Sequence, residues 1–219
     1  MRPLSLLESR VLGVLVEKAH TVPDSYPLSL NALTLGCNQK TARDPVIAAS
    51  EGDVQVAVDA LKALSLAFES SGSRVARYEH NLGRALGIPS QSVALLATLM
   101  LRGPQTASEL RTASERLHRF ADISAVEGFL DELAGRVDEK GGPLAIKLPR
   151  APGAREQRWA HLLSGPVDPG AFDAASDGEA IVPASELAAL KTRVAVVEAE
   201  LDRLRGLVDR VYVELDIPR

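Results

Sequence analysis

Basic side chains gather in two segments of the second half of this sequence. Guanidinium and ammonium groups in such numbers bind phosphate oxygens, which is the chemistry that holds a protein to a nucleic-acid backbone. The cations are Arg111, Arg116 and Arg119, with His118 among them, and then Lys147, Arg150, Arg155 and Arg158, opposed in the second segment only by Glu156. We expect these Lys and Arg side chains to contact DNA. The alternative is a hairpin whose exposed charges only protect its edge from pairing.

Four further cations, in the first half, are candidates for the same role. Lys40 and Arg43 stand in a polar loop, and Arg74 and Arg77 lie on an expected hairpin. A solvated surface is the alternative for all four. For the loop there is one more alternative, in which Arg43 and Asp44 brace the chain locally.

The helix expected at residues 51–64 has the opposite character. It carries Glu51, Asp53 and Asp59 against Lys62 alone. Carboxylates repel phosphates, so we do not expect this helix to read a DNA groove. Its acidity suits a protein partner better.

No grouping of residues predicts catalysis, a cofactor or a metal. The sequence contains no glycine-rich phosphate loop and no nucleophile elbow. Asp131 and Glu132 are adjacent and so leave their helix in different directions, as charges on a solvated face do. The four histidines are scattered without the spacing of metal ligands: His20, His80, His118 and His161. We therefore expect a protein that is not an enzyme and has no cofactor.

Composition places the chain in the cytoplasm. Cys37 is the only cysteine, which excludes an intrachain disulfide and fits a reducing compartment. An acidic residue, Glu8, comes too early for a secretory signal, and the longest apolar run, 93–101, cannot cross a bilayer. The net charge of −4 divides into 0 for residues 1–85, +1 for 86–164 and −5 for 165–219. The acidity therefore belongs to the C-terminal segment, and the basic segments lie outside it.

The first half predicts three helices followed by a hairpin. Ser5 and Glu8 have the spacing of a capping box, and the helix that they open must end before Pro23. A second helix is expected over 29–37 and a third from Ser50, and alternating residues then predict strands around Leu66 and Tyr78. This is the order of a winged-helix domain.

The same order recurs in the second half. We expect a helix over 89–102 that ends at a Gly-Pro pair, a helix capped by Thr106 and Glu109, and a third helix capped by Ser124 and Glu127. Alternation over 144–148 and a return strand around Trp159 predict a second hairpin. The repetition favours two tandem winged-helix domains, at 1–85 and 86–164.

A linker is expected at 165–183 and a coiled-coil helix at 184–217. Apolar residues follow one another at intervals of three and four, which is the a/d seam of a coiled coil. The charged residues beside the seam form opposite-sign pairs in a parallel dimer, although packing of the helix on its own protein and a trimer stay open as alternatives. The seam comprises Leu187, Leu190, Val194, Val197, Leu201, Leu204, Val208, Val211 and Leu215.

Short segments of the first two domains resemble a known bacterial family. They are YPLSLNAL at 26–33, CNQK at 37–40, RDPV at 43–46, GSRV at 72–75, LRGPQT at 101–106 and ELRT at 109–112. Together they resemble the YceH-like family over residues 4–164. The resemblance implies a tandem winged-helix fold in a bacterial cytoplasmic protein, and it implies no activity because the family is a domain of unknown function.

The sequence thus predicts a mainly α protein with small β-hairpins, built from two winged-helix domains and a dimerising coiled coil. The function expected first is a dimeric DNA-binding protein that regulates transcription or belongs to the nucleoid. The alternative is a scaffold whose winged-helix domains bind protein partners.

Overall fold

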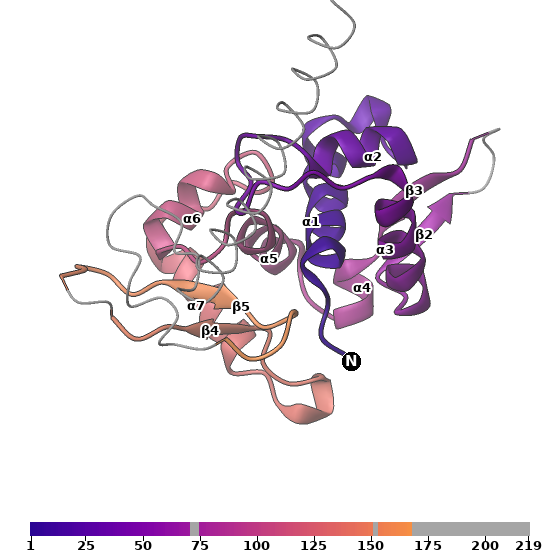
Figure 1. Ribbon diagram of the computed structural model, residues 1–219. Helices are drawn as coiled ribbons and strands as arrows, with labels where there is room; N and C mark the ends of the chain where they lie inside the picture. The colour runs from indigo at the N-terminus through magenta and orange to yellow at the C-terminus, as the bar shows by residue number, and fades with distance from the viewer. Residues whose placement is uncertain (71–74, 151–152, 168–219) are drawn as a thin grey trace, which may run out of the picture. The chain divides into compact units, whose positions relative to one another are not determined.

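The computed structural model describes residues 1–70, 75–150 and 153–167 (Figure 1). The chain divides into two units, Met1–Ser176 and Asp177–Arg219, and everything described belongs to the first. In it, α-helices combine with small antiparallel sheets. The predicted coiled coil, with its seam from Leu187 to Leu215, lies outside the described residues, as do most of the predicted linker and Arg74.

The first half, residues 1–85, begins with three helices and a small sheet. Strand β3 lies in the middle of the sheet, between β1 and β2, and both pairings are antiparallel; Leu28 faces Tyr78, and Ala67 faces His80. A short 3-10 helix, η1, links α1 to β1. The elements in chain order are α1 (Leu6–Thr21), η1 (Pro23–Ser25), β1 (Leu28–Ser29), α2 (Leu30–Cys37), α3 (Glu51–Ala63), β2 (Ala67–Ser70) and β3 (Arg77–His80).

Helix starts in the first half follow the predicted caps. The Ser5 side chain accepts a hydrogen bond from the Glu8 N–H, and the Glu8 carboxylate accepts one from the Ser5 N–H. Ser50 and Asp53 repeat this capping box at the start of α3. Each box satisfies backbone donors that a helix N-terminus leaves free, so the predicted starts of α1 and α3 are confirmed.

The second half, residues 86–164, repeats three helices and a hairpin. Strands β4 and β5 are antiparallel, and a single bridge between Gln105 and Trp159 adds a third extended segment beside β5. The elements are α4 (Leu82–Leu86), which connects the halves, then α5 (Ser90–Arg102), α6 (Ala107–Ala113), α7 (Ile123–Ala134), η2 (Asp138–Lys140), β4 (Ala145–Lys147) and β5 (Trp159–His161).

Two details of the second half differ from the prediction. Helix α7 begins at Ile123, and the side chain of Asp122 accepts from the Ala125 N–H, so the predicted capping box of Ser124 and Glu127 is wrong. Asp122 is an equally good capping residue that stands two positions earlier, and it extends the helix by about half a turn. Helix α4, which the sequence analysis missed, is short and ends at Gly87 in the left-handed conformation.

A single hydrophobic core joins the two halves. Helices α1 and α5 lie side by side (Figure 1), and Gly13 permits their close approach. A Cβ atom built on Gly13 would lie 2.9 Å from Cγ of Leu101, closer than such atoms approach. Buried residues of both helices belong to the same cluster. The halves therefore pack as neighbours, and the domain boundary at residue 85 stays a prediction from the sequence.

Candidate functional site

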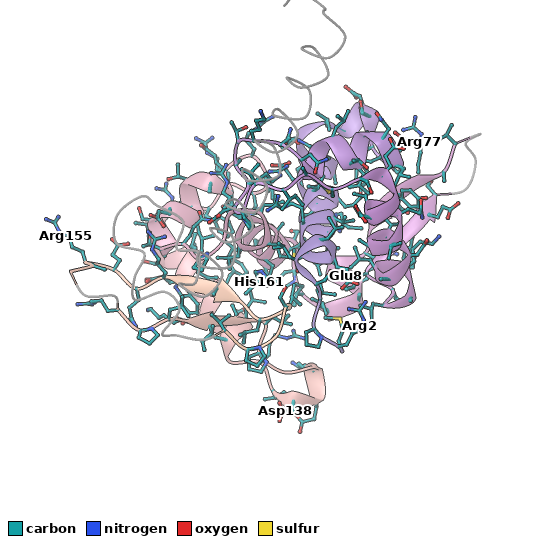
Figure 2. The ribbon with its side chains drawn as sticks, viewed as in Figure 1. Arg2, Glu8, Arg77, Asp138, Arg155 and His161 are labelled. Atoms are coloured by element: carbon teal, nitrogen blue, oxygen red, sulfur yellow. The ribbon has the colours of Figure 1, made fainter. Side chains whose placement is uncertain are left out.

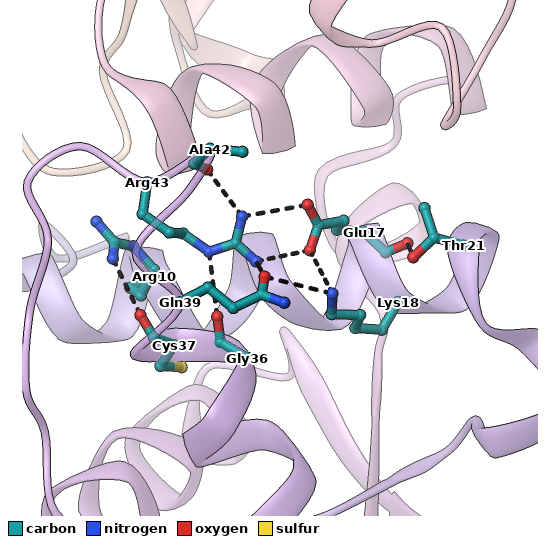
Figure 3. A network of polar contacts seen from close by, with 9 residues as sticks. All are labelled: Arg10, Glu17, Lys18, Thr21, Gly36, Cys37, Gln39, Ala42 and Arg43. Atoms are coloured by element: carbon teal, nitrogen blue, oxygen red, sulfur yellow. Dashed lines mark hydrogen bonds and ion pairs between the residues drawn. The ribbon is translucent and has the colours of Figure 1, made fainter.

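The loop between α2 and α3 is held by a buried arginine (Figure 3). The Arg43 guanidinium donates to both carboxylate oxygens of Glu17 on α1, over 3.1 and 2.6 Å. It also donates to Gln39 Oε1 over 2.6 Å and to the carbonyl oxygens of Gly36 and Ala42. The side chain of Arg43 has no exposed surface. The bracing role that the sequence left open for Arg43 agrees with these contacts, and we leave Arg43 out of the candidate DNA surface.

Neighbouring charges determine the protonation state of the Glu17 carboxylate. Burial raises the pKa of Glu17, but the hydrogen bond and charge of Arg43, with a smaller contribution from Lys18, outweigh burial and lower the pKa overall. Lys18 Nζ lies 3.1 Å from Glu17 Oε2. The carboxylate therefore stays ionised at neutral pH and neutralises the buried guanidinium.

A second buried arginine lies beside this network. Arg10 has no exposed surface, and it donates to the carbonyl oxygens of Cys37 and Pro45 over 3.1 and 2.6 Å. Its Nε atom has no hydrogen-bond partner among the described residues. Burial lowers the pKa of Arg10, and burial raises the pKa of the Cys37 thiol to about 12, which makes that thiol unreactive. Arg10 was not among the predicted residues, although its position within an apolar helix face was an available signal.

The β4–β5 hairpin carries the most exposed group of cations. Arg155 extends from the tip of the hairpin, away from the helices (Figure 2), and Arg150 is also exposed. Lys147 is exposed too, and its Nζ lies 5.3 Å from the centre of the Trp159 ring, which fixes the ammonium at the base of the hairpin. Among the described residues, none of these three cations has an ion pair.

Arg158 differs from its neighbours on the hairpin. Its guanidinium pairs with both oxygens of Glu109 on α6, over 3.0 and 3.1 Å, and donates to the Pro104 carbonyl oxygen. Glu109 is also the second member of the predicted capping box with Thr106, which is confirmed. The ion pair thus joins β5 to the start of α6, and Arg158 has less freedom to meet a ligand than Arg155.

Helix α6 and the turn after it present three more of the predicted cations. Arg111 is exposed and donates to the Ala121 carbonyl oxygen over 3.2 Å. Arg119 is exposed and lies 4.0 Å from Glu115, a distance at which an exposed pair contributes little. Arg116 is exposed with no ion pair among the described residues. These side chains lie on the half of the protein that also carries the basic hairpin.

The remaining first-half cations are less prominent. Lys40 is exposed in the loop that Arg43 braces. Arg77, on the hairpin of the first half (Figure 2), is partly buried and donates to the Pro27 carbonyl oxygen over 2.8 Å. The sequence favoured the second half as the more basic surface, and in the described residues the exposed charge is concentrated on its hairpin.

Neither third helix presents a cation on its exposed face. In α3 the exposed charged residues are Glu51, Asp53 and Asp59, and in α7 they are Asp131 and Glu132. Lys62, the single lysine of α3, is held by Glu69 over 2.7 Å. The acidic character predicted for α3 therefore extends to its counterpart α7.

Two histidines are partly buried, and their surroundings favour the neutral imidazole. Burial lowers the pKa of His80 to about 4 and that of His161 to about 4. The Nδ1 atom of each is buried without a hydrogen-bond partner among the described residues. These side chains pack in the interior and take no part in the basic surface.

Comparisons with known proteins identify a family of bacterial proteins to which no function is assigned. The family described as "Protein of unknown function, DUF480" matches residues 4–154. A UPF0502 protein of Burkholderia pseudomallei is 61% identical over 217 residues, which cover 99% of this chain and 91% of the relative. A UPF0502 protein of Cupriavidus taiwanensis is 59% identical over 223 residues, covering 99% and 89%.

The family match covers the segments on which the predicted resemblance rested. That resemblance holds at the level of a bacterial family without an assigned activity, and its narrower YceH-like name stays a prediction. Among the helices that the structure describes, none has the length and apolar character to span a bilayer. By the extent of the family match and the identity to these relatives, the chain belongs to the UPF0502 (DUF480) family of uncharacterised bacterial proteins.

Proposed function

We propose that this protein is a tandem winged-helix protein that binds double-stranded DNA through the sugar–phosphate backbone. The observation that carries the proposal is the β4–β5 hairpin, on which Lys147, Arg150 and Arg155 are exposed without ion pairs among the described residues. In a winged-helix domain this hairpin is the wing, and a wing with free cations contacts phosphates. The exposed arginines of α6 and its following turn add positive charge to the same half.

The order of elements supports a winged-helix assignment for each half. In the first, α1, β1, α2 and α3 precede a hairpin whose return strand pairs with β1. In the second, the Gln105–Trp159 bridge takes the place of that β1 pairing, between α5 and α6. A fold assigned on element order says nothing of the partner, so the DNA proposal depends on the charges alone.

The charges also determine the mode of binding that we propose. Sequence-specific winged helices place the third helix in the major groove, where its side chains meet base edges. The exposed faces of α3 and α7 carry carboxylates and no cation. We therefore propose backbone binding with little sequence preference, which is typical of a nucleoid-associated protein.

We further propose that a C-terminal coiled coil pairs two copies of the chain. This step rests on the heptad seam of the sequence, from Leu187 to Leu215. Two copies would double the phosphate contacts and steepen the dependence of affinity on salt. Replacing Leu201 and Leu204 with Asp should give a monomer in sedimentation analysis, and an unchanged sedimentation coefficient would rule out this dimer.

Fluorescence anisotropy of the full-length protein with duplex DNA of random sequence, across a salt series, tests the proposal. We expect Arg155→Glu to lower the affinity about tenfold and to make the salt dependence shallower, by about one phosphate contact. Arg84→Glu is the matched control, because Arg84 is exposed on α4 and changes the net charge equally. Equal effects of the two substitutions, or no binding at low salt, would count against DNA as the partner.

A second candidate function, a protein-interaction scaffold, is favoured by the exposed surface of α2 and α3. Leu35 is 65% exposed and Val56 is 71% exposed, and the carboxylates of α3 share the exposed face with Val56. Asn31 of α2 donates to Glu51 of α3, so the starts of these helices are adjacent. Apolar residues beside exposed carboxylates suit a basic protein partner better than DNA.

Affinity capture after nuclease treatment separates the two candidates. A scaffold should retain a stoichiometric protein partner without nucleic acid, and Val56→Glu should release it. Val137→Glu is the control, since Val137 is 52% exposed in the second half. An empty capture after nuclease treatment would exclude the scaffold role.

A further inference from the structure

A cleft of about 910 Å³ opens between the loop that precedes α3 and the first elements of the second half. Ala42 and Asp44 form one side. The end of α5, helix α6 and the start of β5 form the other, with Arg102, Arg116 and Arg158 among the lining side chains. The volume is within the range of small-molecule sites, and the lining includes no aromatic residue.

Two of the arginines that line the cleft already form ion pairs within the protein. Arg158 is held by Glu109 in a two-bond ion pair. Arg43, which also borders the cleft, is neutralised by Glu17. These groups shape the cleft, and their charge is not available to a ligand without breaking an existing pair.

Asp44 is one of three acids that line the cleft, with Glu109 and Glu115. Its backbone N–H donates to the Leu101 carbonyl oxygen over 2.8 Å, which fixes the loop against the end of α5. Its carboxylate lies close enough to the buried Arg10 to stabilise the charged form of that guanidinium. Arg10 thus offsets the negative charge of Asp44 from within the protein.

Two cations that line the cleft, Arg102 and Arg116, are not neutralised by these contacts. Both are exposed and border the cleft, and neither has a hydrogen bond or ion pair among the described residues. Glu115 also lines the cleft, and its exposed contact with Arg119, at 4.0 Å, contributes little. The cleft therefore combines two free guanidinium groups with the hydroxyl groups of Ser108 and Thr112.

We propose that this cleft binds a small, non-aromatic dianion, such as a phosphate ester or a dicarboxylate, between Arg102 and Arg116. Guanidinium groups form two parallel hydrogen bonds with carboxylate or phosphate oxygens, and two of them match a ligand with two negative charges. The absence of aromatic lining argues against a nucleobase, which proteins hold by stacking. The proposal does not rest on DNA binding: Arg116 is shared with the proposed DNA surface, but Arg102 lies outside that surface, so Arg102 variants test the cleft by itself.

Isothermal titration calorimetry of the full-length protein with pyrophosphate and with succinate tests the site. For at least one probe we expect saturable binding of one ion per chain, weakened about tenfold or more by Arg102→Ala and by Arg116→Ala. Arg119→Ala is the matched control, since Arg119 is 87% exposed on the same surface but does not line the cleft. It should leave the affinity unchanged.

Measuring the affinity for duplex DNA in parallel shows whether the cleft binds a small free anion or the phosphates of the DNA backbone. Saturable binding of a probe that Arg102→Ala abolishes, with the affinity for duplex DNA unchanged, supports a separate small-ligand site. The proposal is overturned if neither probe saturates, or if Arg102→Ala and Arg119→Ala have equal effects. It is also overturned if Arg102→Ala weakens only the binding of duplex DNA, because the cleft then belongs to the DNA surface.

Discussion

Arg43 and Glu17 form a buried ion pair in which each nitrogen of the guanidinium fork meets one carboxylate oxygen, over 3.1 and 2.6 Å. Arg43 comes from the loop after α2 and Glu17 from α1, so the pair fastens an irregular segment to a helix. The Arg43 side chain has no exposed surface. Without Glu17 the guanidinium would be buried near a second cation, Arg10, whose pKa is lowered mainly by burial and also by the charge of Arg43.

Loss of this carboxylate should destabilise the fold strongly. We expect Glu17→Gln to lower the free energy of unfolding by about 3 kcal/mol at pH 7, because it leaves a buried charge without its partner. Urea denaturation measures the change. Glu115→Gln breaks the exposed contact with Arg119 and should cost less than about 0.5 kcal/mol. Similar losses of unfolding free energy in the two variants would mean that the buried pair stabilises the fold no more than the exposed contact does.

Acid should lower the stability of the fold between pH 6.5 and about 4, because of the partly buried His80 and His161. Burial lowers the pKa of His80 and His161 from 6.5 to about 4, so between these values the unfolded chain binds protons that the folded chain does not. Stability is therefore full above pH 6.5 and falls as the pH drops towards 4, by about 1.4 kcal/mol per pH unit for each histidine at most. Glu17, whose pKa is lowered from 4.5, adds a loss only below that pH.

Urea denaturation at a series of pH values measures this slope. His161→Gln should make the dependence between pH 6.5 and 5 shallower, because one titrating group is removed. A slope unaffected by His161→Gln would show that this histidine is not held neutral.

Two glycine substitutions should change stability in opposite directions. In Gly13→Ala the new Cβ atom meets the buried Leu101 side chain at 2.9 Å between α1 and α5, and we expect a loss of about 1–3 kcal/mol. In Gly128→Ala, on the exposed side of α7, nothing lies within 4 Å of the new atom. Alanine restricts the unfolded chain there, which should stabilise by about 0.5–1 kcal/mol. Thermal unfolding of both variants checks the signs, and a neutral Gly13→Ala would contradict the close packing.

The start of α7 gives a test of the corrected cap. Asp122→Ala should cost about 1 kcal/mol, because the Ala125 N–H loses its acceptor. Ser124→Ala, within the first turn, should change stability by less than about 0.5 kcal/mol. Denaturation midpoints that rank the two variants in the reverse order would favour Ser124 as the cap.

Local signals in the sequence were sufficient to predict most helices. Ser5, Ser50 and Thr106 each precede an acidic residue by three positions, and each opens a helix as predicted. The prediction at Ser124 was wrong because Asp122 offers the same chemistry two residues earlier. Capping identifies a start reliably only where one capping residue is present.

Side-chain roles were harder to predict than helices. Arg43 has the sequence context of an exposed loop cation, and its burial depends on Glu17, which lies 26 residues away in the chain. Arg158 likewise pairs with Glu109 across 49 residues. The cleft beside Arg102 has walls from both halves, so no local pattern could indicate it. Long-range pairing decides which cations remain free, and the sequence pattern does not contain it.

The close packing of α1 against α5 has a consequence for how the protein unfolds. Because buried residues of both halves belong to one cluster, separating the halves would expose apolar surface on each. We expect a single cooperative transition for residues 1–164. The two hairpins should accordingly keep a constant spacing, so that a ligand held by one hairpin also fixes the orientation of the other.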